Sequence, residues 1–433
     1  MRLYTAVRHA HSRIYSRARG RSRLSFLSAT LMAAGIGLVL GGRPALGADI
    51  TFTGDPAMLG TDPVYTTPGS LFPGASSSGN TLTYQSGAMS GNVLGGADGG
   101  AGAVFDNTVI FQGGTVTDPG YAIYVSGGAA KAGAVYGNSL TVSGGSIGSG
   151  STYNAFVSGG SSDTGEVHHN TASFSGGTID GYVNGGLSDS GSVHHNTLTV
   201  SGTNVLAAGY GGYNSGTGAV YSNTMTVLGG SFGSSVAGGR SDNGGDVTAN
   251  TLTIAGGDFS AASTVYGGRA EGVGGNIASN NTVIISGGTF ASGRDVYGGY
   301  SDSGDASGNT VVISGGDFGG RYVYGGRAGA ASHVASGNTV TISGGSNIGT
   351  VYVGWTPGTA SNNTLTINGP GNYFTAASEL FGGYAANGSS NTLNVREYTG
   401  SLDAIHYFDT YDFLLPAGLM PGQPSSPSPT RYF

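Results

Sequence analysis

The chain has 433 residues, of which 86 are glycine and only 9% are charged, whereas average proteins contain about 7% glycine and about 25% charged residues. So few charges, together with an apolar content of 38%, exclude a solvated disordered chain, and scarce proline without a glycine triplet register excludes collagen. Glycine, serine, threonine and asparagine around short apolar segments instead predict an all-β protein with many short strands and tight turns.

Residues 1–47 have the composition of an export signal. Seven arginines lie before residue 24, an apolar run covers residues 24–40, and small residues surround Ala45 and Gly47. This order predicts a signal peptide with an extended basic n-region, which the Sec export machinery would recognise and which would be cleaved near Gly47. A membrane anchor is the alternative, but a run of about 17 residues that includes serine, threonine and glycine is marginal for crossing about 30 Å of hydrocarbon.

The charge of the exported chain follows from the loss of that segment. Residues 1–47 contain eight of the 16 basic residues and none of the 23 acidic residues, so the remainder carries a net charge of −15. No nucleic acid and no anionic membrane surface is therefore expected as a partner. Cysteine is absent, so hydrogen bonds and packing must hold the fold without disulfides.

Residues 48–79 are expected to form an N-terminal cap. The segment contains four prolines and no clear copy of the repeat that follows it. A repeat fold ends in an open face of unpaired strands, and a segment of different composition beside the first repeat is suited to cover that face.

Residues 80–396 are built from one repeated phrase, an Asn-Thr pair (once Asn-Ser) followed by alternating apolar and hydroxyl residues. The copies recur at nearly regular intervals without a helical pattern between them. A period of about 28 residues is typical of a solenoid. The anchors are Asn80, Asn107, Asn138, Asn170, Asn196, Asn223, Asn250, Asn281, Asn309, Asn338, Asn363 and Asn391.

Each copy predicts a short strand with one buried face. An apolar residue lies two and again four positions after the anchor, as Val311 and Ile313 do after Asn309, and the residues between them are mostly threonine or serine. The same alternation places the anchor on the buried side, where its amide needs hydrogen-bond partners. Equivalent amides in stacked copies can supply them, so the asparagines are predicted to form an internal ladder.

Two further apolar segments complete each copy. One follows a Gly-Gly pair, as at Thr289-Phe290, and the other is a Val-Tyr-Gly-Gly phrase that recurs at Val265, Val296 and Val323. Three short strands and three glycine-rich turns per copy predict a right-handed parallel β-helix of about 12 coils of ~28 residues. A β-propeller is the rival architecture, but its blades need about 40 to 50 residues.

The tyrosines of the Val-Tyr-Gly-Gly phrases allow two interpretations. Exposed rings could offer stacking sites for sugars or protein partners, or the rings could pack in the turns, which is the favoured interpretation.

Aspartates recur in Ser-Asp-x-Gly phrases and could align on stacked coils. Polysaccharide-acting β-helix enzymes need such clustered carboxylates, often with calcium. The favoured interpretation is that each aspartate caps its own turn with its side chain. The four aspartates are Asp163, Asp189, Asp242 and Asp302.

Two histidine pairs, His168-His169 and His194-His195, each directly precede an anchor, and the two anchors belong to successive copies of the repeat. On stacked coils the pairs would lie side by side, where a surface zinc or nickel site is conceivable. Duplication of the repeat explains the same pattern without a metal. The sequence therefore predicts no catalytic, cofactor-binding or metal-binding residues.

Residues 397–433 depart from the repeat and are expected to form a closing segment and a disordered proline-rich tail. The closing phrase runs from Tyr398-x-Gly400-Ser401 to Leu415-Pro416. Together with the basic leader, the Asn-Thr-Leu-Thr-Val-Ser-Gly-type repeats and the Val-Tyr-Gly-Gly phrases, it resembles the passenger region of Gram-negative autotransporters over residues 1–416.

That resemblance implies a passenger displayed on the cell surface after export across both bacterial membranes. Autotransporters end in a transmembrane β-barrel, and no such domain follows the closing phrase in this sequence. The expectation is therefore a truncated autotransporter or a released passenger, with a membrane contact only through the missing barrel.

The function expected from the sequence is structural or adhesive and not enzymatic. The protein is expected at the cell surface or outer membrane, or outside the cell, with surface glycans or proteins of host or bacterium as partners. A polysaccharide-acting β-helix enzyme, a lyase or hydrolase, is the alternative.

Overall fold

The computed structural model describes residues 47–416 except 75–76, 118–119, 149–153, 262–263, 291–294 and 385–386. The predicted signal peptide up to residue 46 and the proline-rich tail from residue 417 lie outside the described residues. Regular structure in the described part is β, apart from one turn of 3-10 helix, η1 (Pro56–Met58). No helix among these residues is long and apolar enough to cross a membrane.

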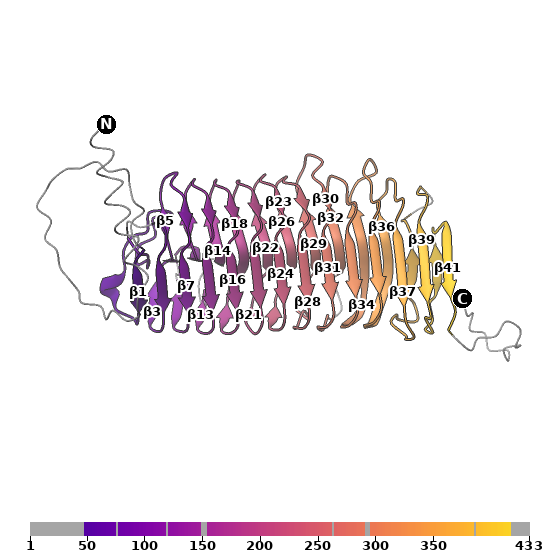
Figure 1. Ribbon diagram of the computed structural model, residues 1–433, viewed down its shortest axis with the longest axis horizontal. Coiled ribbons are helices and arrows are strands. Elements are labelled where there is room, and N and C mark those ends of the chain that lie inside the picture. The colour runs from indigo at the N-terminus through magenta and orange to yellow at the C-terminus, as the bar shows by residue number, and fades with distance from the viewer. Residues whose placement is uncertain are drawn as a thin grey trace, which may run out of the picture. The chain divides into compact units, whose positions relative to one another are not determined.

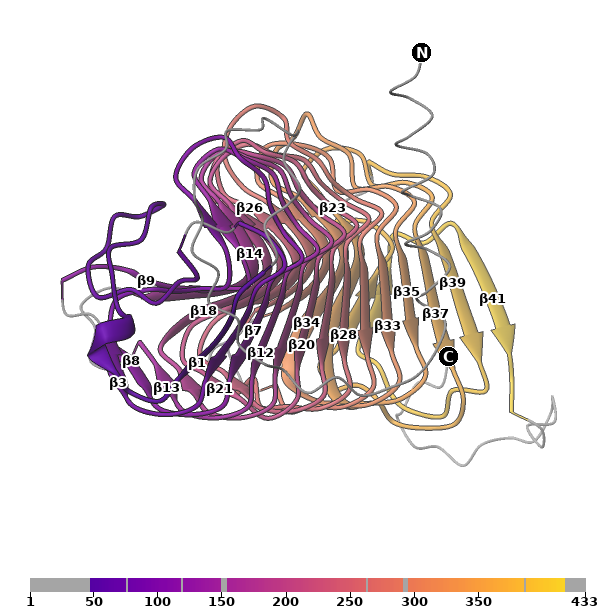
Figure 2. The same cartoon turned by 60° about the vertical axis from the view of Figure 1, so that its left-hand side comes forward.

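The strands stack as coils of a solenoid. Each named strand pairs in parallel with the equivalent strand of a neighbouring coil, as Figures 1 and 2 show for the first sheet from β1 to β41. The expected all-β parallel β-helix of about 12 turns is thereby confirmed.

The first sheet contains the strands that follow the anchor asparagines. In β33, Val311 lies opposite Val283 on one side and Val340 on the other, so identical positions of the repeat are in register. Buried and half-exposed residues alternate as predicted. In spatial order the strands are β1 (Asp49–Phe52), β2 (Thr81–Tyr84), β7 (Thr108–Phe111), β12 (Ser139–Val142), β16 (Thr171–Phe174), β20 (Thr197–Val200), β24 (Thr224–Val227), β28 (Thr251–Ile254), β31 (Thr282–Ile285), β33 (Thr310–Ile313), β35 (Thr339–Ile342), β37 (Thr364–Asn368), β39 (Thr392–Arg396) and β41 (Thr410–Leu414).

The second sheet contains the Val-Tyr-Gly-Gly phrases. Its main path is β4 (Val93–Leu94), β9 (Ile123–Ser126), β14 (Ala155–Ser162), β18 (Gly181–Ser188), β22 (Gly209–Asn214), β26 (Val236–Ser241), β29 (Val265–Ala270), β32 (Val296–Ser301), β34 (Asp317–Ala328), β36 (Ser346–Trp355), β38 (Glu379–Phe381) and β40 (Ala404–His406). Beside this path, β10 (Ala129–Ala130) pairs with β14 and with β5 (Ala97–Asp98).

Two smaller sheets complete the coils, so many coils have four strands where the sequence predicted three. The strands after the first Gly-Gly pair form one of them: β25 (Ser231–Phe232), β21 (Asn204–Val205), β17 (Thr178–Ile179), β13 (Ser146–Ile147), β8 (Thr115–Thr117) and β3 (Ala88–Ser90). The row missed from the sequence lies just before the anchors: β30 (Ala278–Ser279), β27 (Val247–Thr248), β23 (Val220–Tyr221), β19 (Val193–His194), β15 (Val167–His168), β11 (Val135–Tyr136) and β6 (Val104–Phe105).

The missed row creates a second core, separate from the main core between the larger sheets. Its strands place valine or alanine three residues before the anchor, and these side chains are fully buried. The recurrence of valine at that position was a usable signal, but two-residue strands are too short for an alternating pattern to identify. The second core contains Val104, Ala130, Val135, Val167, Val193, Val220, Val247, Ala270 and Ala278.

The predicted asparagine ladder is present. The Oδ1 atom of Asn309 accepts hydrogen bonds from the backbone N–H and the Nδ2 atom of Asn281, at 3.0 and 3.2 Å. The Nδ2 atom of Asn309 donates to Oδ1 of Asn338 at 3.1 Å and to the carbonyl of Ala278 in the preceding coil at 2.9 Å. Because both amide hydrogens and the amide oxygen are used, these buried groups have no unmet hydrogen-bond capacity.

The ladder extends into both ends of the described chain. The backbone N–H of Ala48 donates to Oδ1 of Asn80 at 2.9 Å, and that of Asn391 donates to a carboxylate oxygen of Asp409 at 2.9 Å. Asp409 directly precedes β41, which pairs with β39. An aspartate therefore takes the place of the next asparagine, inside the segment expected to close the fold.

The second glycine of the Val-Tyr-Gly-Gly phrase passes directly over the ladder. A Cβ atom on Gly268 would lie 2.4 Å from the side-chain amide of Asn281, and one on Gly299 would lie 2.4 Å from that of Asn309. No side chain fits at that distance, so this position requires glycine because of close approach.

We expect Asn309→Ala to lower the free energy of unfolding by about 3 kcal/mol or more, because it removes the acceptor of the backbone N–H and of one Nδ2 hydrogen of Asn281, and the side-chain donor to the carbonyl of Ala278, all of them buried. Urea denaturation and amide hydrogen exchange of the flanking coils measure this effect. Asn394→Ala is the control, since the side chain of Asn394 is half-exposed and makes one bond of 3.3 Å to Thr366. Equal losses for the two variants would contradict a stabilising role of the ladder.

Candidate functional site

Two rows of side chains run along the second sheet, one on each side of the Gly-Gly pairs. The first, here called the tyrosine row, consists of aligned residues of β29 to β40: Tyr266, Tyr297, Tyr324, Tyr352, Phe381 and His406. The second, here called the arginine row, consists of aligned residues of β22 to β36: Tyr213, Arg240, Arg269, Tyr300, Arg327 and Trp355.

The tyrosine row is a continuous stack of rings. The ring centroids of Tyr266 and Tyr297 are 5.1 Å apart, and those of Tyr297 and Tyr324 are 4.7 Å apart, with nearly parallel planes. These three residues are only 5 to 7% exposed. The interpretation of exposed rings as stacking sites is therefore wrong for them, because the rings are buried and stack on one another.

The guanidinium groups of the arginine row lie against the tyrosine row. The Cζ atom of Arg269 is 4.9 Å from the ring centroid of Tyr266. That of Arg327 is 5.9 Å from the ring centroids of both Tyr297 and Tyr324. Within its own row it is 4.6 Å from the Trp355 ring and 5.3 Å from the Tyr300 ring. Guanidinium groups at these distances from aromatic rings are favourably placed for cation–π attraction.

The charges of Arg240 and Arg269 are neutralised by neighbouring carboxylates. Arg240 donates through Nε to Asp242 at 2.6 Å and through Nη2 to Glu271 at 3.0 Å. Arg269 forms an ion pair with the other oxygen of Glu271. Burial raises the pKa of Glu271, and the positive charges of Arg269 and Arg240 act in the opposite direction.

Arg327 differs from these two arginines. It donates from Nη1 to the hydroxyl of Tyr297 at 3.2 Å, and it forms no ion pair with a carboxylate among the residues that the structure describes. Its Nε atom, like that of Arg269, is buried without a hydrogen-bond partner in the described part of the chain. A half-buried guanidinium in this state favours an anion as an additional partner.

The two rows border a cleft of about 280 Å³. Its walls present guanidinium groups, tyrosine hydroxyls and the carboxylate of Asp295, which accepts a hydrogen bond from the hydroxyl of Tyr297 at 3.0 Å. The lining residues are Thr264, Tyr266, Arg269, Asp295, Tyr297, Tyr300 and Arg327.

The hydroxyls in this cleft stay protonated in any physiological buffer. Burial raises the pKa of Tyr300 to about 12, and the hydrogen bond and charge of Asp302 act in the same direction. Burial, followed by the charge of Asp295, also raises the pKa of Tyr297. These groups can therefore donate or accept hydrogen bonds to a ligand, but they cannot act as bases near neutral pH.

Nearer the N-terminus, the predicted cap covers the same face of the second sheet. The ring of Tyr65 stacks on that of Tyr124, with centroids 3.8 Å apart and planes 9° apart. Its hydroxyl lies 3.1 Å from Oγ of Ser161, and Ser161 is aligned through Leu187 with the arginine row. A planar, hydroxyl-bearing group from elsewhere in the chain thus fits against this face.

The Ser-Asp-x-Gly turns are capped by serine, so the interpretation of aspartate as the cap is wrong. Oγ of Ser301 accepts the backbone N–H of Gly304 at 2.8 Å and donates to a carbonyl of the preceding coil. The equivalent serines at 162, 188 and 241 accept from their own turns in the same way. Serine is the buried partner because it ends the strand facing inward, while the following aspartate points outward.

The aspartates instead contact neighbouring side chains. Asp163 pairs with Lys131, and Asp189 accepts the hydroxyl of Ser215 at 2.8 Å. Asp302 accepts the hydroxyl of Tyr300 at 2.6 Å. Burial, followed by the negative charge of Asp163, raises the pKa of Asp189. The four aspartates are therefore divided among separate polar contacts along the turns.

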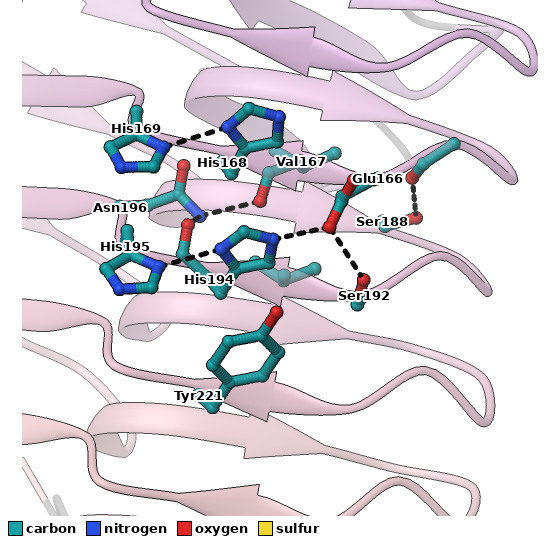
Figure 3. Close-up of polar contacts among 12 residues, drawn as sticks. Glu166, Val167, His168, His169, Ser188, Ser192, His194, His195, Asn196 and Tyr221 are labelled. Carbon is teal, nitrogen blue, oxygen red and sulfur yellow. Dashed lines mark hydrogen bonds and ion pairs between the residues drawn. The ribbon is translucent and has the colours of Figure 1, made fainter.

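The two histidine pairs do lie side by side on neighbouring coils (Figure 3). The rings of His168 and His194 stack with centroids 5.1 Å apart, and those of His169 and His195 with centroids 5.0 Å apart. Among the described residues, no group of three or more histidine, aspartate or glutamate side chains is arranged to hold one metal ion.

Comparisons with family models, with curated proteins and with solved structures found no match for this chain.

The arginine row was missed in the sequence, although a signal was present. Arginine directly follows a Val-x-Gly-Gly phrase at Arg240, Arg269 and Arg327, and these are three of the eight basic residues after residue 47. The repeat of Gly-Gly-Arg indicates alignment, but the contacts of the arginines with the tyrosine rings are visible only in the structure.

We expect Ser301→Ala to cost about 1–2 kcal/mol of stability, because it removes a buried turn cap and a bond to the preceding coil. Asp302→Ala, in the same turn, is expected to cost less than about 0.5 kcal/mol, because the side chain is exposed. Thermal and urea denaturation of the two variants test the assignment of the cap. A larger loss for Asp302→Ala would restore the aspartate as the capping group.

Proposed function

We propose that this protein is the passenger region of an autotransporter-like exported protein, displayed at or released from the surface of a Gram-negative bacterium. In this role the β-helix is a rigid, non-enzymatic spacer that presents the cleft beside the arginine row to surface glycans. The basic leader, the absence of cysteine and the repeat phrases support export of this kind.

One observation carries the choice of ligand: the Arg327 guanidinium lies in a cleft of aromatic rings and hydroxyls and lacks a carboxylate partner among the described residues. A carboxylated sugar can supply that partner by a charge-assisted hydrogen bond. The surrounding tyrosine hydroxyls and Asp295 can bond the hydroxyl groups of the sugar rings. We therefore propose an acidic polysaccharide as the ligand class.

The negative net charge of the exported chain makes glycan binding depend on the charge of the glycan. A net charge of −15 repels a polyanion at long range, so binding depends on the local positive charge of the cleft. A neutral glycan would bond the hydroxyls but leave Arg327 without an anion. This predicts discrimination between charged and neutral forms of one polysaccharide.

We expect purified protein to bind oligogalacturonate and to bind its methyl ester at least about tenfold more weakly, because esterification removes the charge-assisted bond. Arg327→Gln should weaken binding of the acid by a similar factor. The control is Arg396→Gln, which makes the same charge change at an arginine paired with Asp412 in the first sheet. Calorimetric titration of the three proteins measures these affinities. Equal affinities of the two variants, or of the two glycans, would contradict the proposal.

A second candidate is a polysaccharide lyase or hydrolase on the same fold. It is favoured by one feature, the placement of Asp242 and Glu271 on adjacent coils together with Arg240 and Arg269. These carboxylates are engaged by the arginines in ion pairs, which favours a structural role for them.

Under the adhesive proposal, incubation with oligogalacturonate should release neither unsaturated ends, the product of a lyase, nor new reducing ends, the product of a hydrolase. Ultraviolet absorbance and a reducing-sugar assay detect the two products. A product formed by the protein and abolished in Glu271→Gln would replace the adhesive proposal by the enzymatic one.

A further inference from the structure

The two histidine pairs share an unusual geometry in which neighbouring residues of the chain point their side chains at each other. The Nδ1 atoms of His168 and His169 are 2.9 Å apart, and those of His194 and His195 are 2.8 Å apart (Figure 3). Within each pair the ring planes are nearly perpendicular, at 88° and 86°.

A feature of the coil backbone brings these side chains together. Successive side chains of an extended strand point to opposite faces, but His169 and His195 have left-handed φ angles of 56° and 54°. The equivalent residues Asn280 and Asn362 have φ angles of 57°. The left-handed conformation is thus a general feature of the repeat. At the histidine pairs it directs the two neighbouring side chains toward each other.

Glu166 contacts one of the two pairs. Its Oε1 atom lies 2.6 Å from Nε2 of His194, on the ring edge opposite the Nδ1 atom (Figure 3). A carboxylate in this position can accept the Nε2–H of the imidazole, and carboxylates placed in this way orient metal-ligating histidines.

We propose that each histidine pair chelates one divalent transition-metal ion through its two Nδ1 atoms, with Cu²⁺ bound more tightly than Ni²⁺ or Zn²⁺. Two nitrogen ligands at about 2.0 Å from one ion and at a right angle lie about 2.8 Å apart, which matches the separations in both pairs. Imidazole suits these ions, and the preference for Cu²⁺ follows the general order of metal affinity.

The spacing of the coils makes these two separate sites. Equivalent rings are 5.0 to 5.1 Å apart, too far for four nitrogens to reach one ion at ligand distance. Since no third histidine, aspartate or glutamate in the described chain joins either pair in a ligand cluster, water or a ligand from outside completes each coordination sphere.

A purely structural role is the competing explanation. His168 stacks between Tyr136 and His194, and His194 stacks on Tyr221 at 4.5 Å. Any aromatic ring could fill this column, and tyrosine does so on both sides. Ring stacking gives no reason for the second histidine of each pair. A hydrogen bond between the two Nδ1 atoms would give one, so the titration below compares this metal-free role with chelation.

The test is calorimetric titration of purified, tag-free protein with Cu²⁺, compared with the double variant His169→Asn and His195→Asn. Asparagine already occupies this left-handed position in other coils, so the fold should be retained, and circular dichroism checks this. The wild type should bind two more Cu²⁺ ions per chain than the double variant, and His195→Asn alone should lose one. Glu166→Gln should weaken one site by about tenfold while the other is unchanged.

A second double variant, His168→Tyr and His194→Tyr, keeps the ring column and removes one ligand of each pair. It should lose both ions and the nitrogen signature in the electron paramagnetic resonance spectrum of Cu²⁺. Unchanged stoichiometry in either double variant would overturn the proposal, as would equal binding of Cu²⁺ by wild type and all variants.

Discussion

The amide ladder at the corner of the coils is the interaction on which the rest of this structure depends. The side chain of each interior asparagine is fully hydrogen-bonded only when coils on both sides are present, as the four bonds of Asn309 illustrate. A buried amide without these partners would cost more than the hydrogen bonds contribute when made. The ladder therefore enforces the register of the coils, and with it the alignment of every other position of the repeat.

The glycine pairs, and the surface above them, are consequences of the ladder. The second glycine passes so close to the asparagine amide that no Cβ fits. The tyrosine and arginine rows lie before and after the glycine pairs, and residues of both rows border one cleft. Because the coils are in register, single side chains become rows, and arginines from successive copies of the repeat, such as Arg240 and Arg269, come to share Glu271.

The same register explains why the histidine pairs of two neighbouring coils lie at equivalent positions. The left-handed residue before each anchor converts His168-His169 and His194-His195 into converging pairs, and coil stacking places one pair directly above the other. Elsewhere the same column contains tyrosine, phenylalanine or small polar residues, which continue the stack without converging nitrogens. Functional groups are thus brought together in this fold where two adjacent coils have the same unusual residues at the same position of the repeat.

The sequence by itself determined the repeat, the buried face of the strand after each anchor and the internal position of the asparagines, because these depend on periodicity and parity, which are local properties of the chain. It did not reveal the row of two-residue strands, which span a single period of alternation and therefore show no repeat of it. Nor did it reveal Asp409 as a rung, since Asp409 follows Asn391 by much less than one full period of the repeat. It also left the tyrosine rings open to two interpretations and assigned the turn caps to aspartate instead of serine.

Only the tertiary structure decided those points, because each depends on what the next coil places nearby: the ring that covers Tyr297, the carbonyl that accepts from Ser301, the tyrosines that lie beneath Arg327. A repeat sequence shows which residues recur, whereas their burial and their charge partners are set by contacts between coils.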